Sequence, residues 1–224
     1  MKIFLATASL DEIRWAARSG LLDGVLTTPA TLAEERREGD EAEQLVQIAG
    51  ATGAPVAPVV ASVHAFSAAD VYRGGRELAR LSDRIVVQVP LVEDAMEAIR
   101  RLSAEGIRVA ATLVFNAAQA LLAAKAGASI VGVQLEPLDA VGTDPAQTIA
   151  AIRAILDSAG AECDVMAIRP RTAAQFIACA RAGADAAAVA PSVLRALMLH
   201  PLTDRGVDQF LNDLSRLPRS RAEP

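Results

Sequence analysis

A carboxylate, an imidazole and two guanidinium groups stand at places in the chain where an active site could form. Glu136 and His64 are candidate acid–base groups, because carboxylates and imidazoles are common proton-transfer groups in enzymes. Arg169 and Arg171 are candidates for binding an anionic ligand, since guanidinium groups make paired hydrogen bonds to oxyanions. Structural roles are the alternatives: Glu136 could pair with Arg169, His64 could be an ordinary loop residue, and Arg169-Pro170-Arg171 could be a solvated loop.

These residues lie beside short apolar runs that alternate with longer helix-type stretches. The runs predict strands at Ile3–Ala6, Gly24–Thr27, Val56–Ala61, Ile85–Val89, Val109–Val114, Ile130–Leu135, Val165–Ile168 and Ala186–Ala190. The stretches predict helices at Asp11–Ser19, Thr31–Ala49, Ala68–Leu81, Glu93–Ala104, Ala117–Ala126, Pro145–Ala159, Thr172–Ala182 and Ser192–Leu199. Glycine after two of these stretches, as in Ala126–Ala128 and Ala182–Ala184, is typical of helix ends.

Eight strand–helix units predict a (β/α)8 TIM barrel of the α/β class. No linker-like composition divides the chain, so we expect one domain over residues 1–217 with an extra C-terminal helix at Asp204–Leu217, and a frayed tail at residues 218–224. An open doubly wound sheet is the alternative, but no glycine-rich phosphate motif follows the first strand. Sites in barrels lie at the carboxyl ends of the strands. Alternation places Gln134 and Glu136 on one side of the sixth strand.

Composition and charge exclude several classes of function. The chain has 224 residues, with 22 Lys and Arg against 27 Asp and Glu, a net charge of −5, which argues against general nucleic-acid binding. No apolar run is long enough for a membrane span. The two cysteines, Cys163 and Cys179, show neither metal-ligand spacing nor a disulfide framework. We therefore expect a cytoplasmic protein without metal or cofactor.

Five segments, taken in order, resemble the small transaldolase family, and in particular its fructose-6-phosphate aldolase-like branch. Gly24–Pro29 and Ile85–Pro90 resemble the motifs of the family's second and fourth strands. Glu105–Ala128 is similar to its fifth unit, Arg171–Gln175 to the segment after its seventh strand, and His200–Phe210 to its C-terminal signature. The resemblance extends over nearly the whole chain. It implies a transaldolase-type barrel and a homo-oligomer, often ring-shaped.

The resemblance also implies Schiff-base aldol chemistry, in which a barrel lysine attacks a ketose carbonyl. The position in this chain that matches the lysine is Gln88. A carboxamide nitrogen is delocalised into its carbonyl, so it cannot condense with a ketone as an amine does. The two lysines of the chain are Lys2, at the start of the first predicted strand, and Lys125, near the end of a predicted helix. We expect both to be solvated surface charges.

Other family positions also differ. The chain has Ala6 in place of an aspartate, Gln134 in place of a tyrosine, Pro137 in place of an arginine, and Arg169 in place of a small hydroxyl residue. Thr28 replaces an asparagine, whereas Thr112 matches the family. If the family register holds, the candidate ligand-binding residues at the barrel mouth are Gln88, Thr112, Gln134, Arg169, Arg171 and Thr28, with Glu136 and His64 as acid–base candidates.

Three functions remain as alternatives. The first is a divergent family member that binds a small anionic sugar or carbonyl compound, most simply a phosphorylated one, without Schiff-base chemistry. The second is a catalytically inactive oligomeric scaffold or regulatory protein. The third is a genuine transaldolase or aldolase of carbohydrate metabolism that uses a lysine in an unrecognised place.

Overall fold

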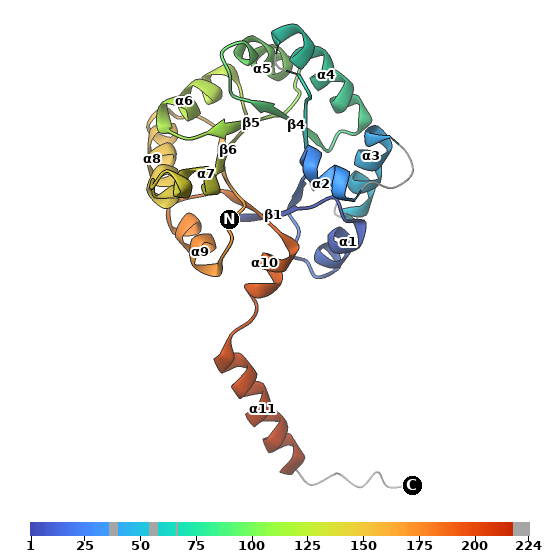
Figure 1. Ribbon diagram of the computed structural model, residues 1–224, viewed down its shortest axis with the longest axis vertical. Helices are drawn as coiled ribbons and strands as arrows, with labels where there is room; N and C mark the ends of the chain where they lie inside the picture. The colour runs from blue at the N-terminus through green and yellow to red at the C-terminus, as the bar shows by residue number, and fades with distance from the viewer. Residues whose placement is uncertain (36–39, 54–57, 66, 217–224) are drawn as a thin grey trace.

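The computed structural model describes residues 1–35, 40–53, 58–65 and 67–216. Within these ranges, eight parallel strands pair in sequence order and close into a barrel, so the fold is a (β/α)8 TIM barrel (Figure 1). The strands are β1 (Lys2–Ala6), β2 (Gly24–Leu26), β3 (Val59–Ser62), β4 (Ile85–Pro90), β5 (Val109–Val114), β6 (Ile130–Gln134), β7 (Asp164–Ile168) and β8 (Ala186–Val189). All except β3 begin and end within one residue of the prediction.

Helices surround this barrel and also cap one of its ends. They are α1 (Leu10–Arg18), α2 (Pro29–Glu34), α3 (Glu41–Ala51), α4 (Ala68–Leu81), α5 (Ala95–Ala104), α6 (Ala117–Ala126), α7 (Leu135–Ala140), α8 (Pro145–Ser158), α9 (Ala173–Arg181), α10 (Pro191–Ala196) and α11 (Pro201–Arg216). The short helices α2, α7 and α10 follow directly after strands. They therefore lie at the carboxyl ends of the strands, the end seen in Figure 1.

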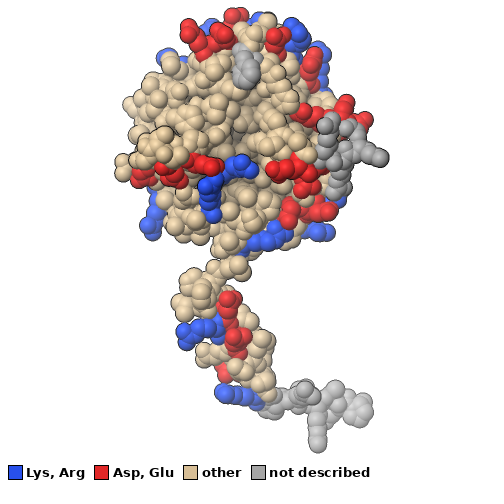
Figure 2. Space-filling view, viewed as in Figure 1, with Lys and Arg blue, Asp and Glu red and all other residues tan. Residues whose placement is uncertain are grey.

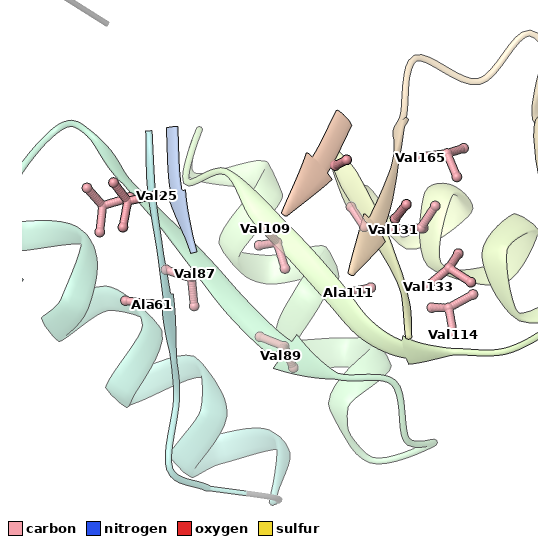
Figure 3. Close-up of a cluster of buried hydrophobic side chains, with 14 of the residues drawn as sticks. Val25, Ala61, Val87, Val89, Val109, Ala111, Val114, Val131, Val133 and Val165 are labelled. Carbon is pink, nitrogen blue, oxygen red and sulfur yellow. The ribbon is translucent and has the colours of Figure 1, made fainter. Parts of the chain in front are cut away.

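Two apolar layers hold the barrel together. Alternate strand residues face the helices and form the larger layer, in which branched side chains such as Val25, Val87 and Val131 are fully buried (Figure 3). The other strand residues face inward and form a smaller cluster that fills the barrel, which comprises Phe4, Ala6, Leu26, Val60, Val86, Ala110, Ile130, Met166, Ile168, Ala186 and Ala188. Valine and isoleucine suit strands that are buried on both faces.

Two glycines make room for the large side chains inside the barrel. A Cβ atom on Gly24 would lie 2.4 Å from Cε1 of Phe4, and one on Gly132 would lie 2.7 Å from Cδ1 of Ile168. Both distances are far below van der Waals contact, so the aromatic ring and the isoleucine occupy space that a side chain would need. The middle of the barrel is therefore packed with side chains, and openings remain at its two ends: one at the amino-terminal end, where a cavity of about 390 Å³ is lined by Lys2 and Phe4, and one at the carboxyl ends of the strands, where sites form in this fold.

Predicted and observed boundaries differ at several elements: for example, the helix predicted at Ser192–Leu199 ends at Ala196, and the one predicted from Asp204 begins at Pro201. The predicted helix Thr31–Ala49 consists of two helices, α2 and α3; residues 36–39 between them lie outside the described residues. The third strand begins at Val59, and residues 56 and 57 of the prediction lie outside the described residues, as does the tail at 218–224. The sixth strand ends at Gln134, so Glu136 belongs to helix α7 and not to the strand.

The C-terminal helix α11 extends away from the barrel (Figure 1). None of its residues is buried, although the helix is amphipathic and carries Leu202, Val207, Phe210, Leu211 and Leu214, which are between 45% and 65% exposed. Among the described residues, no helix combines the length and apolar character needed to cross a membrane.

Candidate functional site

The centre of the candidate site is Gln88, on the inward-facing side of β4. Strand alternation aligns Gln88 with the interior residue Val86, and only 6% of Gln88 is exposed. Its register partner on β3 is Ser62, whose hydroxyl group donates a hydrogen bond to Oε1 of Gln88 at 3.3 Å. Sequence reasoning did not single out Ser62, because nothing marks a lone serine until the strand register places it opposite Gln88.

Thr112 lies on the neighbouring strand β5 and is also buried. Its hydroxyl oxygen is shielded from solvent and has no hydrogen-bond partner in the part of the chain that the structure describes. The register of β5 against β6 shifts between Ala111 and Val114, and Leu113 takes a left-handed backbone conformation with φ of 60°. Bulges and non-glycine residues in this conformation are concentrated at functional sites.

Gln134 adds a second carboxamide on β6. It is half-buried at the last residue of the strand, and although it occupies the residue before α7, its side chain does not cap that helix. Ser62, Gln88, Thr112 and Gln134 thus come from four consecutive strands and lie near the carboxyl ends of those strands. All four side chains are uncharged, so this part of the barrel can hydrogen-bond a ligand but supplies no ionic group.

The charged candidates lie on the rim. Arg169 follows β7, is exposed, and has φ of 61°, while its backbone N–H donates to the carbonyl oxygen of Ala188 at 2.8 Å. The Arg171 guanidinium lies 2.5 Å from the Glu136 carboxylate, so the partner of Glu136 is Arg171 and not Arg169. Among the described residues, the Arg169 side chain has no carboxylate partner.

Helix α7 explains why Glu136 meets Arg171. Leu135 and Leu138 of α7 are buried, which turns Glu136 and Asp139 outward. Asp139 accepts a hydrogen bond from the Gln175 side chain at 2.8 Å, and Gln175 accepts one from the backbone N–H of Arg171, also at 2.8 Å. These contacts join α7 to the loop after β7. The barrel face in Figure 2 has basic side chains near its centre, with acidic side chains on both sides.

His64 and Thr28 have their polar partners outside the interior group, which is our name for Ser62, Gln88, Thr112 and Gln134. Nε2 of His64 lies 3.5 Å from the Glu41 carboxylate, and His64 lines a cavity of about 420 Å³ between α3 and α4, which Ser62 also lines. Thr28 begins α2: its hydroxyl accepts from the backbone N–H of Thr31, and its own N–H donates to the Thr31 hydroxyl. The Thr28 hydroxyl thus has a structural partner already.

Neither lysine reaches the carboxyl ends of the strands. The ammonium group of Lys2, at the amino-terminal end of β1, lies 2.8 Å from the Asp164 carboxylate at the start of β7. Lys125 is exposed in the last turn of α6, where a cation is favoured by the helix dipole. Both positions are away from the carboxyl ends of the strands, where Gln88 lies.

The two thiols are not activated. Burial raises the pKa of Cys163 to about 12 and that of Cys179 to about 11, so both thiols stay protonated near neutral pH. Among the described residues, no three His, Cys, Asp or Glu side chains are placed to hold a metal ion together.

The closed barrel, with polar side chains at the carboxyl ends of its strands, defines a (β/α)8 barrel protein with a candidate ligand site at the end where such sites form. The profile of the transaldolase/fructose-6-phosphate aldolase family matches residues 3–221. A protein from Prosthecochloris aestuarii named probable transaldolase is 39% identical over 225 residues, covering 98% of this chain and 100% of the relative. One from Hydrogenobaculum, also named probable transaldolase, is 38% identical over 218 residues, covering 97% and 98%. The chain therefore belongs to the transaldolase/fructose-6-phosphate aldolase family.

Two solved structures are similar at the level of fold alone. One is a cube-shaped, highly porous protein cage designed by fusing symmetric oligomeric domains, with a TM-score of 0.61 and 19% identity, covering 95% of this chain and 76% of the other. The second is a dihydrodipicolinate synthase family protein from Coccidioides immitis, with a TM-score of 0.62 and 15% identity, covering 84% and 66%.

The unpartnered hydroxyl of Thr112 predicts a gain in stability when it is removed. We expect Thr112→Val to raise the free energy of unfolding by about 1 kcal/mol, because a buried hydroxyl without a partner is destabilising. The matched control is Thr27→Val: the Thr27 hydroxyl donates to the Val60 carbonyl at 2.9 Å, so its removal should lower stability by about 1 kcal/mol. Urea unfolding measures both. Equal losses in the two variants would show that Thr112 has a structural partner.

Proposed function

We propose that the barrel mouth binds a small anionic sugar or carbonyl compound, most simply a phosphorylated one, without forming a Schiff base. The observation that carries the proposal is the carboxamide of Gln88. It is buried on the inward side of β4, at the position where the family resemblance places the reactive lysine. The positions of Lys2 and Lys125, at the start of β1 and on the outside in α6, support the same view.

The distribution of charge suggests how such a ligand lies. The interior group of Ser62, Gln88, Thr112 and Gln134 is neutral and suits hydroxyl and carbonyl oxygens. Arg169 on the rim has no carboxylate partner among the described residues, so its guanidinium is available to a phosphate or carboxylate group. We therefore place the anionic end of the ligand at Arg169 and the uncharged end inside the barrel.

The acid–base role, if the site is catalytic, falls to Glu136. Arg171 holds its carboxylate on the rim, close to the loop that carries Arg169. His64 faces Glu41 and the cavity between α3 and α4, so it would have to turn away from these contacts to reach a ligand in the barrel. Because Arg171 already has an acidic partner, we assign it a supporting role in binding.

Thermal unfolding with and without ligand tests this proposal. We expect fructose 6-phosphate at millimolar concentration to raise Tm by about 2–4 °C, because binding to the folded state stabilises it. Fructose, which lacks the phosphate, should have little effect. Arg169→Ala should abolish the shift, whereas the control Arg181→Ala, an exposed cation at the far end of α9, should retain it. A panel of sugar phosphates without any shift would favour the inactive scaffold instead.

Borohydride trapping tests the absence of a Schiff base. Wild-type protein incubated with dihydroxyacetone or fructose 6-phosphate and then reduced should show no mass increase, since an amide nitrogen does not form an iminium ion. Gln88→Lys serves as the positive control and should become trappable if the pocket fits a ketose. The name probable transaldolase on the relatives favours the alternative of a genuine transaldolase. A stable adduct on Lys2 or Lys125 of the wild type would establish that alternative.

We also propose a homo-oligomer, ring-shaped as in the family, with α11 as a contact between copies. A lone amphipathic helix of 16 residues with no buried side chain is marginal in water, so its apolar face needs a surface to pack against. Phe210 and Leu214, one turn apart on this helix, are 62% and 45% exposed.

Light scattering after size-exclusion chromatography measures the mass of the particle. The double variant Phe210→Asp and Leu214→Asp should have a lower mass than the wild type, because charges oppose burial of the helix face. Asn212→Asp changes the charge of the same helix but not its apolar residues, and should leave the mass unchanged. A monomeric wild-type protein would contradict the proposal.

A further inference from the structure

We propose that Ser62 is a positioning residue that fixes the Gln88 carboxamide, so that its amide N–H₂ group faces the ligand and donates a hydrogen bond to a carbonyl oxygen. This inference rests on the proposed function of the barrel mouth and deepens it, because it names the uncharged end of the ligand as a carbonyl group.

The first step is the orientation of the Gln88 side chain. In the structure the Ser62 hydroxyl donates to Oε1 of Gln88, at the directly paired position of the next strand. With Oε1 turned toward β3, the amide nitrogen is turned away from Ser62. Among the described residues, the amide nitrogen makes no hydrogen bond, and it is not one of the side-chain atoms that are both shielded from solvent and unpartnered. Its two N–H bonds are therefore available for an acceptor.

The second step is the neighbouring donor. The strand register pairs Gln88 with Ala110 and Pro90 with Thr112, so Thr112 is the next inward residue of β5, diagonally across from Gln88. The Thr112 hydroxyl is buried and lacks a partner among the described residues, and it is not hydrogen-bonded to Gln88. A hydroxyl and an amide that both lack a partner, on adjacent strands, can share one oxygen of a ligand between them.

The third step is the chemistry of that oxygen. Two neutral donors suit an oxygen atom that only accepts hydrogen bonds. A carbonyl oxygen is such an atom, whereas an alcohol also has an O–H proton that needs an acceptor from the protein. Donors fixed by the protein before binding also polarise a carbonyl bond, as they do wherever negative charge develops on oxygen. Without Ser62 the carboxamide is free to turn over and present Oε1, which would repel the carbonyl oxygen.

The test compares dihydroxyacetone phosphate with glycerol 3-phosphate. The two differ only at the second carbon, which is a carbonyl in the first compound and an alcohol in the second. We expect wild-type protein to bind the ketone about 3- to 10-fold more tightly in calorimetry, the range expected for one additional hydrogen bond. Ser62→Ala should reduce this ratio to about 1, because the affinity for dihydroxyacetone phosphate falls more than that for glycerol 3-phosphate. Ser62→Thr, which keeps the hydroxyl, should retain the ratio.

A spectroscopic measurement separates positioning from a merely structural role. The infrared carbonyl stretch of bound dihydroxyacetone phosphate should shift to lower frequency in the wild type and return toward its solution value in Ser62→Ala. Ser129→Ala is the matched control, because the Ser129 hydroxyl, just before the start of β6, donates to the Val109 carbonyl and makes no hydrogen bond to Gln88. It should change neither the ratio nor the stretch.

The outcomes distinguish this inference from the proposed function. If the wild type binds both phosphates equally, and Arg169→Ala weakens both, the mouth binds anions but the carbonyl role of Ser62 and Gln88 is wrong. A ketone preference that persists in Ser62→Ala also overturns the inference. If neither compound binds the wild type, the proposed function fails and this inference fails with it.

Discussion

Closure of the barrel is the constraint on which the rest of the structure depends. Once eight parallel strands pair in a ring, every second residue of each strand must face a narrow interior. Phe4, Met166 and Ile168 fill that interior, and glycines at positions 24 and 132 leave room for the ring of Phe4 and the side chain of Ile168. Polar side chains are therefore found toward the two ends of the barrel, such as Lys2 and Asp164 at the amino-terminal end and Gln88 toward the carboxyl ends of the strands, where water or a ligand can meet them.

The site that results has a neutral interior and a charged rim. Burying an unpaired charge costs far more than burying an amide or hydroxyl, so a barrel with a carboxamide on β4 needs no counter-ion inside. Arg169, Arg171 and Glu136 lie where solvent screens them, and an exposed pair such as Glu136–Arg171 contributes little to stability. In the proposed site, the charged residues on the rim therefore select an anionic ligand. The neutral residues deeper in the same opening hydrogen-bond its uncharged end.

The strands and most helices could be predicted because their signals are local. Runs of valine and isoleucine and glycines after helices are visible in any short window of the sequence. Helix α7 was missed because it has six residues and follows an apolar run without a break, so Leu135 could be read as strand. Two contacts join residues far apart in the chain and could not be predicted. The register of β3 against β4 pairs Ser62 with Gln88, and the path of α7 brings Glu136 to Arg171.

Gln88 differs from a residue that only fills space, because part of its hydrogen-bonding capacity is not used by the protein. A glutamine that only filled space would be expected to have both ends of its carboxamide paired, because each unpaired polar group in a buried place lowers stability. Here Ser62 satisfies the oxygen, the nitrogen makes no hydrogen bond to a described residue, and the nearby Thr112 hydroxyl is shielded from solvent without a partner among those residues. An apolar pair at these two positions would avoid that cost. Two adjacent donors without acceptors therefore argue for a site that is completed by an oxygen from outside the chain, and against a barrel whose interior has only been refilled.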